Sequence, residues 1–256
     1  GPPGTGKTAL TMALAKEYDI PLGLVEADRL VSPLLGDTIK NIRNVFDLAS
    51  EFAKHNGSFI LFFDELDAIT GERANMHEVG EIKRAVISFL QTIDKVNHDQ
   101  IPLAIMGATN HQHQLDSAVW RRFTYHLKFD YPNFIIRKNI IESFLERIEK
   151  CSIGVDPDII TSLNEEYEFL YDLYEDLYEK LGRDLKEHEF YEKNKKLYDS
   201  GKADVLYYTQ GYTGGDLLRG TRVALFKAIQ KSLLEKDDLF SSLQLVGGTK
   251  EHVIES

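Results

Sequence analysis

The chain opens with Gly1-Pro2-Pro3-Gly4-Thr5-Gly6-Lys7-Thr8, which fits the pattern G-x-x-x-x-G-K-[ST] of a phosphate-binding loop. Its glycines let backbone N–H groups turn inward around a phosphate, because no Cβ blocks the approach. Lys7 would add a positive charge at the β- and γ-phosphates, and the Thr8 hydroxyl would hold Mg²⁺. Residues 8–17 are expected to form a helix whose N-terminal dipole also favours an anion.

The second motif carries carboxylates and follows an apolar run at residues 59–63 (FILFF). Such an uninterrupted apolar run is typical of a strand buried on both faces. The run ends in Asp64-Glu65-Leu66-Asp67. Asp64 can hold the Mg²⁺ shell, and Glu65 can polarise an attacking water. Together with the loop at 1–8, this run predicts both halves of a nucleotide-hydrolysis site.

Strand and helix patterns alternate through residue 132. Strands are expected at 22–26, 59–63, 103–108 and near 125–129, with helices between them. This alternation indicates an α/β fold with a parallel sheet, whose usual strand before the phosphate loop we expect upstream of Gly1. Residues 133–240 show only helical periodicity and are expected to form a small all-α lid.

An acidic, tyrosine-rich segment interrupts the helical part. Residues 165–205 hold 13 Asp/Glu against 7 Lys/Arg, a net charge of −6 out of −11 for the chain. We expect an amphipathic helix, then a second helix after Gly182. The segment is either an inserted solvated hairpin or a docking surface for a partner protein.

Overall composition narrows the function class. A net charge of −11 over 256 residues disfavours a nucleic-acid surface, which needs clustered Lys/Arg. The single cysteine, Cys151, fits a reducing compartment and so a cytoplasmic location. No apolar run reaches transmembrane length, but a membrane anchor upstream of Gly1 stays open.

These motifs resemble the core AAA branch of the AAA+ ATPases, which includes FtsH, katanin and spastin. The resemblance covers about 1–164 and 206–235 and is carried by GPPGTGKT at 1–8, FILFFDELDAI at 59–69, ATN at 108–110, the arginine pair 121–122 and TGGDL at 213–217. It implies a P-loop α/β subdomain with a helical lid, Mg²⁺-dependent ATP hydrolysis, and a homo-oligomeric, commonly hexameric, ring.

The resemblance also assigns residues to the site. The nucleotide contacts that it implies are Pro3, Gly4, Thr5, Gly6, Lys7, Thr8, Ala9, Asp64, Gly214 and Gly215. Thr8 and Asp64 would serve the metal, Glu65 would activate water, and Asn110 would be the polar residue called sensor 1. Arg121 and Arg122 match the arginine fingers that a neighbouring subunit supplies.

The chain departs from the family pattern at three places. The two arginines are adjacent, where the family usually separates them by Pro-Gly, so either could be the finger. Asp216 stands where other branches carry a sensor 2 arginine, and Arg219 is not assigned that role. The pore loop has Leu34 and Leu35 in place of an aromatic; these leucines either grip a threaded polypeptide or form a packing corner.

We therefore interpret the chain as an ATP-hydrolysing module that unfolds or remodels protein substrates, working with a peptidase or another partner. The alternatives are a clamp-loader-like ATPase of DNA transactions and a nucleotide-regulated scaffold. The acidic balance disfavours the former, and an intact Glu65 and Asn110 disfavour the latter.

Overall fold

The computed structural model describes residues 1–32, 36–70, 79–181, 190 and 204–248. The chain divides into two compact units, the first comprising residues 1–2 and 6–129 and the second residues 3–5 and 130–256. The predicted boundary after residue 132 lies close to this division. No helix in the described part of the chain is long and apolar enough to cross a membrane.

The first unit is built on a parallel sheet of strands β1 (Leu22–Glu26), β2 (Phe59–Asp64) and β3 (Leu103–Gly107) in the order β1-β2-β3. Leu22 pairs with Ile60 and Phe59 pairs with Leu103, so β2 lies between the other two strands. The apolar residues of β2 are buried on both faces, as a central parallel strand requires. The predicted α/β class with a parallel sheet is confirmed.

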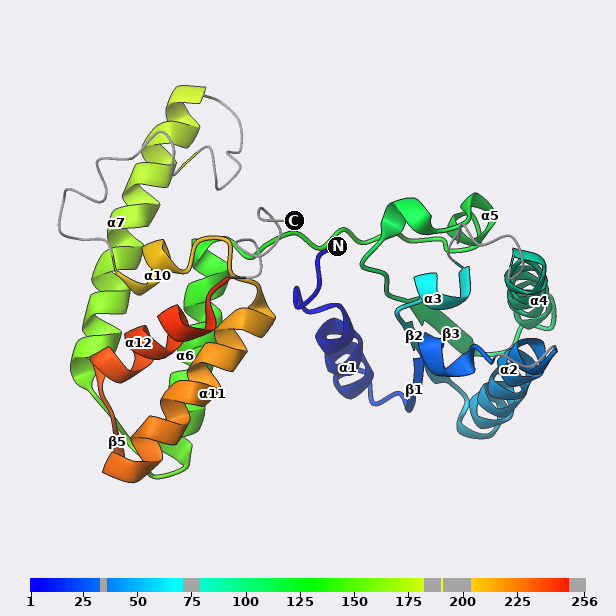
Figure 1. Ribbon diagram of the computed structural model, residues 1–256, viewed down its shortest axis with the longest axis horizontal. Helices are drawn as coiled ribbons and strands as arrows, with labels where there is room; N and C mark the ends of the chain where they lie inside the picture. The colour runs from blue at the N-terminus through cyan, green and yellow to red at the C-terminus, as the bar shows by residue number, and fades with distance from the viewer. Residues whose placement is uncertain (33–35, 71–78, 182–189, 191–203, 249–256) are drawn as a thin grey trace. The chain divides into compact units, whose positions relative to one another are not determined.

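Helices cover this sheet. Helix α1 (Lys7–Glu17) lies to one side of the strands and α2 (Asp37–Asn56) to the other, with α4 (Val79–His98) packed beside α2 (Figure 1). Three phenylalanines, Phe46, Phe63 and Phe89, join these elements, with ring centroids 5.3–5.6 Å apart. Short helical turns complete the unit at η1 (Ala27–Leu30), α3 (Asp67–Thr70), η2 (Gln112–Gln114) and α5 (Ser117–Trp120).

The strand predicted near 125–129 is wrong, because these residues form neither strand nor helix. Ile105 of β3 and Leu127 both line a groove of about 490 Å³. A strand forms only where its backbone pairs with a neighbouring strand, and residues 125–129 take part in neither sheet of the described residues. Tyr125 and Leu127 are accordingly 86% and 71% exposed.

The second unit is helical. Helices α6 (Phe134–Lys150), α7 (Pro157–Leu181), α10 (Val205–Tyr208), α11 (Gly214–Lys231) and α12 (Lys236–Val246) pack around one apolar core (Figure 1). A two-residue parallel pairing of β4 (Gly154–Val155) with β5 (Leu233–Leu234) closes one end. Helix α12 was not predicted, although Leu239 and Leu243 belong to this core.

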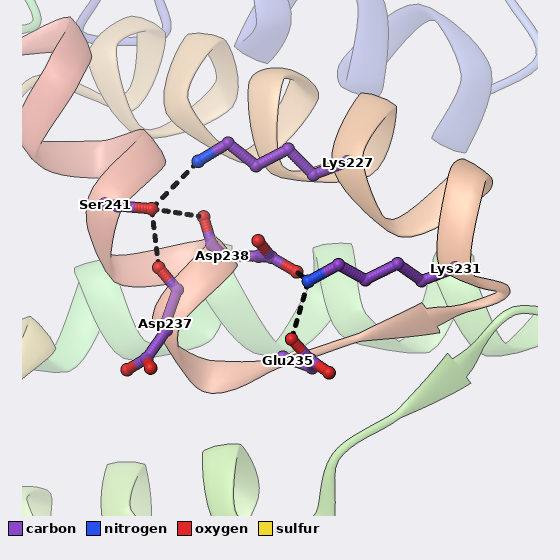
Figure 2. Close-up of polar contacts among 6 residues, drawn as sticks. All are labelled: Lys227, Lys231, Glu235, Asp237, Asp238 and Ser241. Atoms are coloured by element: carbon purple, nitrogen blue, oxygen red, sulfur yellow. Dashed lines mark hydrogen bonds and ion pairs between the residues drawn. The ribbon is translucent and has the colours of Figure 1, made fainter.

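Polar contacts link α11 to α12 on the surface. Lys227 Nζ donates to Ser241 Oγ (2.8 Å), and Lys231 Nζ lies between Glu235 Oε2 (2.6 Å) and Asp238 Oδ2 (3.0 Å) (Figure 2). The side chain of Lys231 is 47% exposed, so these ion pairs are largely solvated. The buried leucines, not these pairs, hold α12 in place.

The acidic segment predicted as an insertion at 165–205 shares residues with the core of the second unit. Helix α7 runs unbroken from Pro157 to Leu181, so the predicted short helix after Pro157 and the helix of the segment are one. Leu170 and Val205 are buried in the core, and Phe190 stacks on Phe134 with ring centroids 6.0 Å apart. The predicted bounds therefore cut through packed structure. The second helix expected after Gly182 lies outside the described residues.

Candidate functional site

The phosphate-binding loop begins α1, as the sequence predicts. Gly4 and Gly6 have φ values of 74° and 98°, a left-handed conformation that favours glycine. Gly6 is the residue before α1, so the free N–H groups of the first turn follow the loop directly. Ala9 lies exposed in that first turn. The loop therefore joins a left-handed turn to a helix N-terminus.

Lys7 folds back onto this loop. Its Nζ donates to Gly1 O (2.7 Å) and Pro2 O (2.6 Å). Burial lowers the pKa of Lys7 below its usual range, while the nearby carboxylates of Asp64 and Asp67 act in the opposite direction. The amine is thus held among backbone carbonyls at the mouth of the loop, where phosphate oxygens would compete for it.

Thr8 meets Asp64 directly. Thr8 Oγ1 donates to Asp64 Oδ2 (2.8 Å), joining the start of α1 to the carboxyl end of β2. Asp64 Oδ1 accepts from the N–H of Glu65 (3.0 Å). A hydroxyl and a carboxylate side by side are the oxygen donors that Mg²⁺ prefers, so these two residues fit the predicted metal pair.

Glu65 and Asn110 stand on the turns that follow β2 and β3. Glu65 is exposed and has φ of 51°, an uncommon conformation for a residue with a side chain. The Oδ1 atom of Asn110 is buried and has no hydrogen-bond partner among the described residues. Buried polar atoms are normally paired, so this amide oxygen is suited to a partner that binds here.

The two arginines differ in their surroundings. Arg122 forms a two-pronged ion pair with Asp94 of α4, with Nε to Oδ1 at 2.7 Å and Nη2 to Oδ2 at 3.0 Å. The hydrogen bonds that Arg122 donates to the Asp94 carboxylate raise the pKa of Arg122. Arg121 is exposed, and its side chain has no hydrogen bond or ion pair to any described residue. Asp94 was not singled out by the sequence analysis.

Gly214 and Gly215 open α11 in the second unit. Thr213 caps this helix in a capping box with Asp216, whose carboxylate accepts from Thr213 N at 2.8 Å. Arg219, to which no sensor 2 role is assigned, pairs with Asp216. Pro3, Gly4 and Thr5 also belong to this unit, and Gly215 N donates to Gly4 O (2.9 Å). Leu34 and Leu35, the predicted pore residues, lie outside the described residues.

One pair close to the site was missed. Thr109 Oγ1 donates to Asp67 Oδ1 at 2.6 Å, bridging the turns that carry Asn110 and Glu65. Asp67 is the last residue of the motif DELD, and Thr109 is the middle residue of the motif ATN. Neither motif indicates by itself that these two side chains are in contact.

Comparisons with known proteins identify the family of the chain. The model of the family described as "ATPase family associated with various cellular activities (AAA)" matches residues 1–131. An uncharacterized AAA family ATPase of Sinorhizobium fredii is 38% identical over 170 residues, which cover 66% of this chain and 48% of the relative. A putative 26S proteasome regulatory subunit homolog of Methanothermobacter thermautotrophicus is 35% identical over 157 residues, which cover 61% and 41%.

A solved structure supports the fold. The AAA domain of FIGL-1, in complex with ADP, superposes with a TM-score of 0.61 at 21% identity, over 97% of this chain and 70% of that one. The chain spans less than half the length of the two curated relatives above. Because the family model matches residues 1–131, more than half of the chain, the chain belongs to the AAA family of ATPases.

Proposed function

We propose that this chain is a Mg²⁺-dependent ATPase module that works in a ring of identical copies and remodels protein substrates. The observation that carries the proposal is the 2.8 Å hydrogen bond between Thr8 and Asp64, which brings the two halves of the nucleotide site together. Glu65 follows Asp64 directly, so the group that would take a proton from water stands next to the metal pair.

The residues divide the work of hydrolysis. Lys7 and the N–H groups of the loop bind phosphate oxygens. Thr8 and Asp64 would hold Mg²⁺, which when bound would neutralise charge on the phosphates. Glu65 orients water and accepts its proton. The Asn110 amide, whose oxygen has no partner among the described residues, contacts that water or the terminal phosphate.

Arg121 is the arginine that we assign to a neighbouring copy's site. An arginine finger must be exposed and must leave its donors available for phosphate oxygens. Arg121 meets both conditions, whereas the guanidinium of Arg122 already donates two hydrogen bonds to the carboxylate of Asp94. This choice decides between the two adjacent arginines, which the sequence left open.

Remodelling of protein substrates rests on the family and on charge. The chain resembles a putative proteasome regulatory subunit homolog, and its net charge of −11 does not favour a nucleic-acid substrate. A homo-hexameric ring, a partner docked near 165–205 and a cytoplasmic location are part of the same proposal.

A complementation experiment tests the ring. Arg121→Ala and Glu65→Gln should each hydrolyse ATP slowly alone, but a mixture should recover activity. In the mixture, an intact Glu65 of one copy can meet an intact Arg121 of its neighbour. Lys7→Ala mixed with Glu65→Gln is the matched control, since it removes ATP binding from the subunit that keeps Glu65. Absence of recovery despite demonstrated subunit exchange would refute the trans arrangement.

A further inference from the structure

Glu65 and Asn110 lie beyond the paired parts of their strands. The last residue pair between β2 and β3 joins Phe63 to Gly107, and the two site residues follow on separate turns. Strand register therefore does not fix the distance between them. Other contacts must hold the turns in place if a water is to meet both side chains.

Backbone contacts provide part of that hold. Ala108 N donates to Phe63 O (2.8 Å), and Leu66 N donates to Ala108 O (2.8 Å). Leu66 packs so closely over Gly107 that a Cβ there would lie 2.7 Å from Leu66 Cδ2. The turn that carries Glu65 thus rests directly on the end of β3.

The Thr109 hydroxyl completes the link with side-chain atoms. It donates to Asp67 Oδ1 at 2.6 Å and accepts from His111 N at 2.9 Å. Thr109 and His111 are the neighbours of Asn110 on either side, and Asp67 stands two residues after Glu65. Through its hydrogen bonds to His111 and Asp67, the Thr109 hydroxyl therefore links the residues on both sides of Asn110 to the turn that carries Glu65.

We propose that Thr109 and Asp67 are positioning residues that set the placement of Glu65 relative to Asn110. The proposal rests on the hydrolytic roles assigned to those two residues above. Within the described part of the chain, neither Glu65 nor Asn110 has side-chain hydrogen bonds that fix its orientation. Glu65 is exposed with φ of 51°, and Asn110 Oδ1 has no hydrogen-bond partner among the described residues. Their orientation depends on the turns, and the turns are joined through the Thr109–Asp67 hydrogen bond.

The proposal predicts which kinetic constant changes. In the proposed function Lys7 and the N–H groups of the loop bind the phosphates, whereas the Thr109 hydroxyl bonds to Asp67 and to His111 N. Loss of the Thr109 hydroxyl should therefore lower kcat and leave ATP affinity unchanged, as expected when only transition-state interactions are lost. A displacement of about 1 Å in a catalytic group can cost about 100-fold in rate.

The first test compares three threonine variants. Thr109→Val keeps the side-chain shape and removes the hydroxyl, and kcat should fall about 10- to 100-fold with ATP affinity within about twofold. Thr109→Ser restores the hydroxyl and should recover most of the rate. Thr92→Val is the matched control, because the Thr92 hydroxyl donates only to Ser88 O of its own helix (2.7 Å). Thermal unfolding is measured for each variant.

The second test is a double-mutant cycle. Asp67→Ala should lower kcat in the same way, and the double variant with Thr109→Val should be no slower than the worse single variant. If Thr109→Val does not fold, kcat and ATP affinity are measured for Asp67→Ala and Thr109→Ser instead, and the proposal is judged on those two constants. Collapse of both Thr109→Val and Asp67→Ala would overturn the proposal, since the pair would then hold the fold and not the site.

Other outcomes also overturn it. An unchanged kcat in Thr109→Val, a loss confined to ATP affinity, or additive losses in the double variant would each do so. Glu65→Gln, assayed beside these variants, separates the two levels. If Glu65→Gln retains turnover, the proposed function fails; if it loses turnover while Thr109→Val keeps it, only the positioning role fails.

Discussion

Glu65 in the first unit and Glu166 in the second stand in opposite surroundings. Glu65 is exposed on a turn with positive φ, and its carboxylate has no hydrogen bond or ion pair to the described residues. Glu166 is 2% exposed, and its two oxygens accept three backbone N–H groups, those of Asp204, Leu206 and Tyr207, at 2.7–2.9 Å.

The same contrast holds for other polar groups. Asn110 Oδ1 is buried without a hydrogen-bond partner in the described part of the first unit. In the second unit Arg137, fully buried, donates to Pro132 O (2.8 Å) and Leu206 O (2.8 Å). The contrast concerns these particular groups: the Asn110 oxygen has no partner among the described residues, whereas the hydrogen bonds of Arg137 to Pro132 and Leu206 join segments of the chain.

The comparison predicts two classes of variant. Changes to the unpartnered groups of the first unit should alter turnover and leave stability nearly unchanged. Changes to the satisfied or buried groups of the second unit should alter stability, while the chemistry per folded molecule stays the same.

The largest effect is expected from Arg121→Ala. Supplying an arginine finger to a terminal phosphate is worth about 10³–10⁵ in rate in GTPases, so turnover should fall by at least about 10³-fold. Steady-state hydrolysis at saturating ATP measures it. Arg122→Ala is the matched control. It should lose less turnover, because it removes an ion pair with Asp94 and not a contact to a neighbouring copy's nucleotide. A larger loss in Arg122→Ala would reverse the assignment.

A smaller but clear effect is expected from Leu170→Ala in the core of the second unit. Leu170 is fully buried, and truncating a buried leucine costs about 2–5 kcal/mol. Tyr178→Ala, on the same helix but 43% exposed, should cost less than about 1 kcal/mol. Urea denaturation measures both. Equal stability of the two variants would support the separable insertion predicted at 165–205.

Stability should also depend on pH through Glu166. Burial raises the pKa of its carboxyl above the ordinary value of 4.5, against the lowering effect of the three backbone hydrogen bonds. Between the unfolded and the raised folded pKa the native state binds more protons, so this contribution falls as pH rises. The stability margin of the parent over Glu166→Gln should therefore narrow from pH 4 through this window. A margin that widens with pH would show a depressed pKa.

The smallest effect is expected from Lys231→Ala. Its ion pairs with Glu235 and Asp238 are exposed to solvent, where such pairs contribute little (Figure 2). The melting temperature should shift by no more than the scatter between repeat melts, at low and at high salt. A salt-dependent loss of stability would show that the surface contacts of α11 and α12 matter more than their buried leucines.

The sequence was most informative where motif and periodicity coincide. The loop at 1–8, the buried strand at 59–63 and the parallel sheet were predicted, because a glycine-rich loop and a doubly buried strand have few alternatives. The strand predicted near 125–129 was wrong because the pattern of apolar residues does not by itself show whether a segment pairs with another strand.

In the second unit the sequence misplaced boundaries. Tyrosines and carboxylates at 165–181 suggested a separate amphipathic helix, yet Leu170 continues the buried face of one helix that starts at Pro157. The site followed the same rule: Glu65 and Asn110 are marked by motifs, whereas the Thr109–Asp67 contact arises only when β2 and β3 lie side by side.

The most direct test of the contrast applies one chemical change to both units and measures turnover and stability together. Glu65→Gln should bind ATP as the parent does, lose about 10²–10⁴ in turnover, and unfold at the same urea concentration. In Glu166→Gln the side-chain amide places an N–H where a carboxylate oxygen accepted the N–H of Leu206, so two donors face each other. It should lose about 1–3 kcal/mol of stability and keep parental turnover per folded molecule at a temperature where it remains folded. Turnover retained in Glu65→Gln, or stability unchanged in Glu166→Gln, would contradict the account.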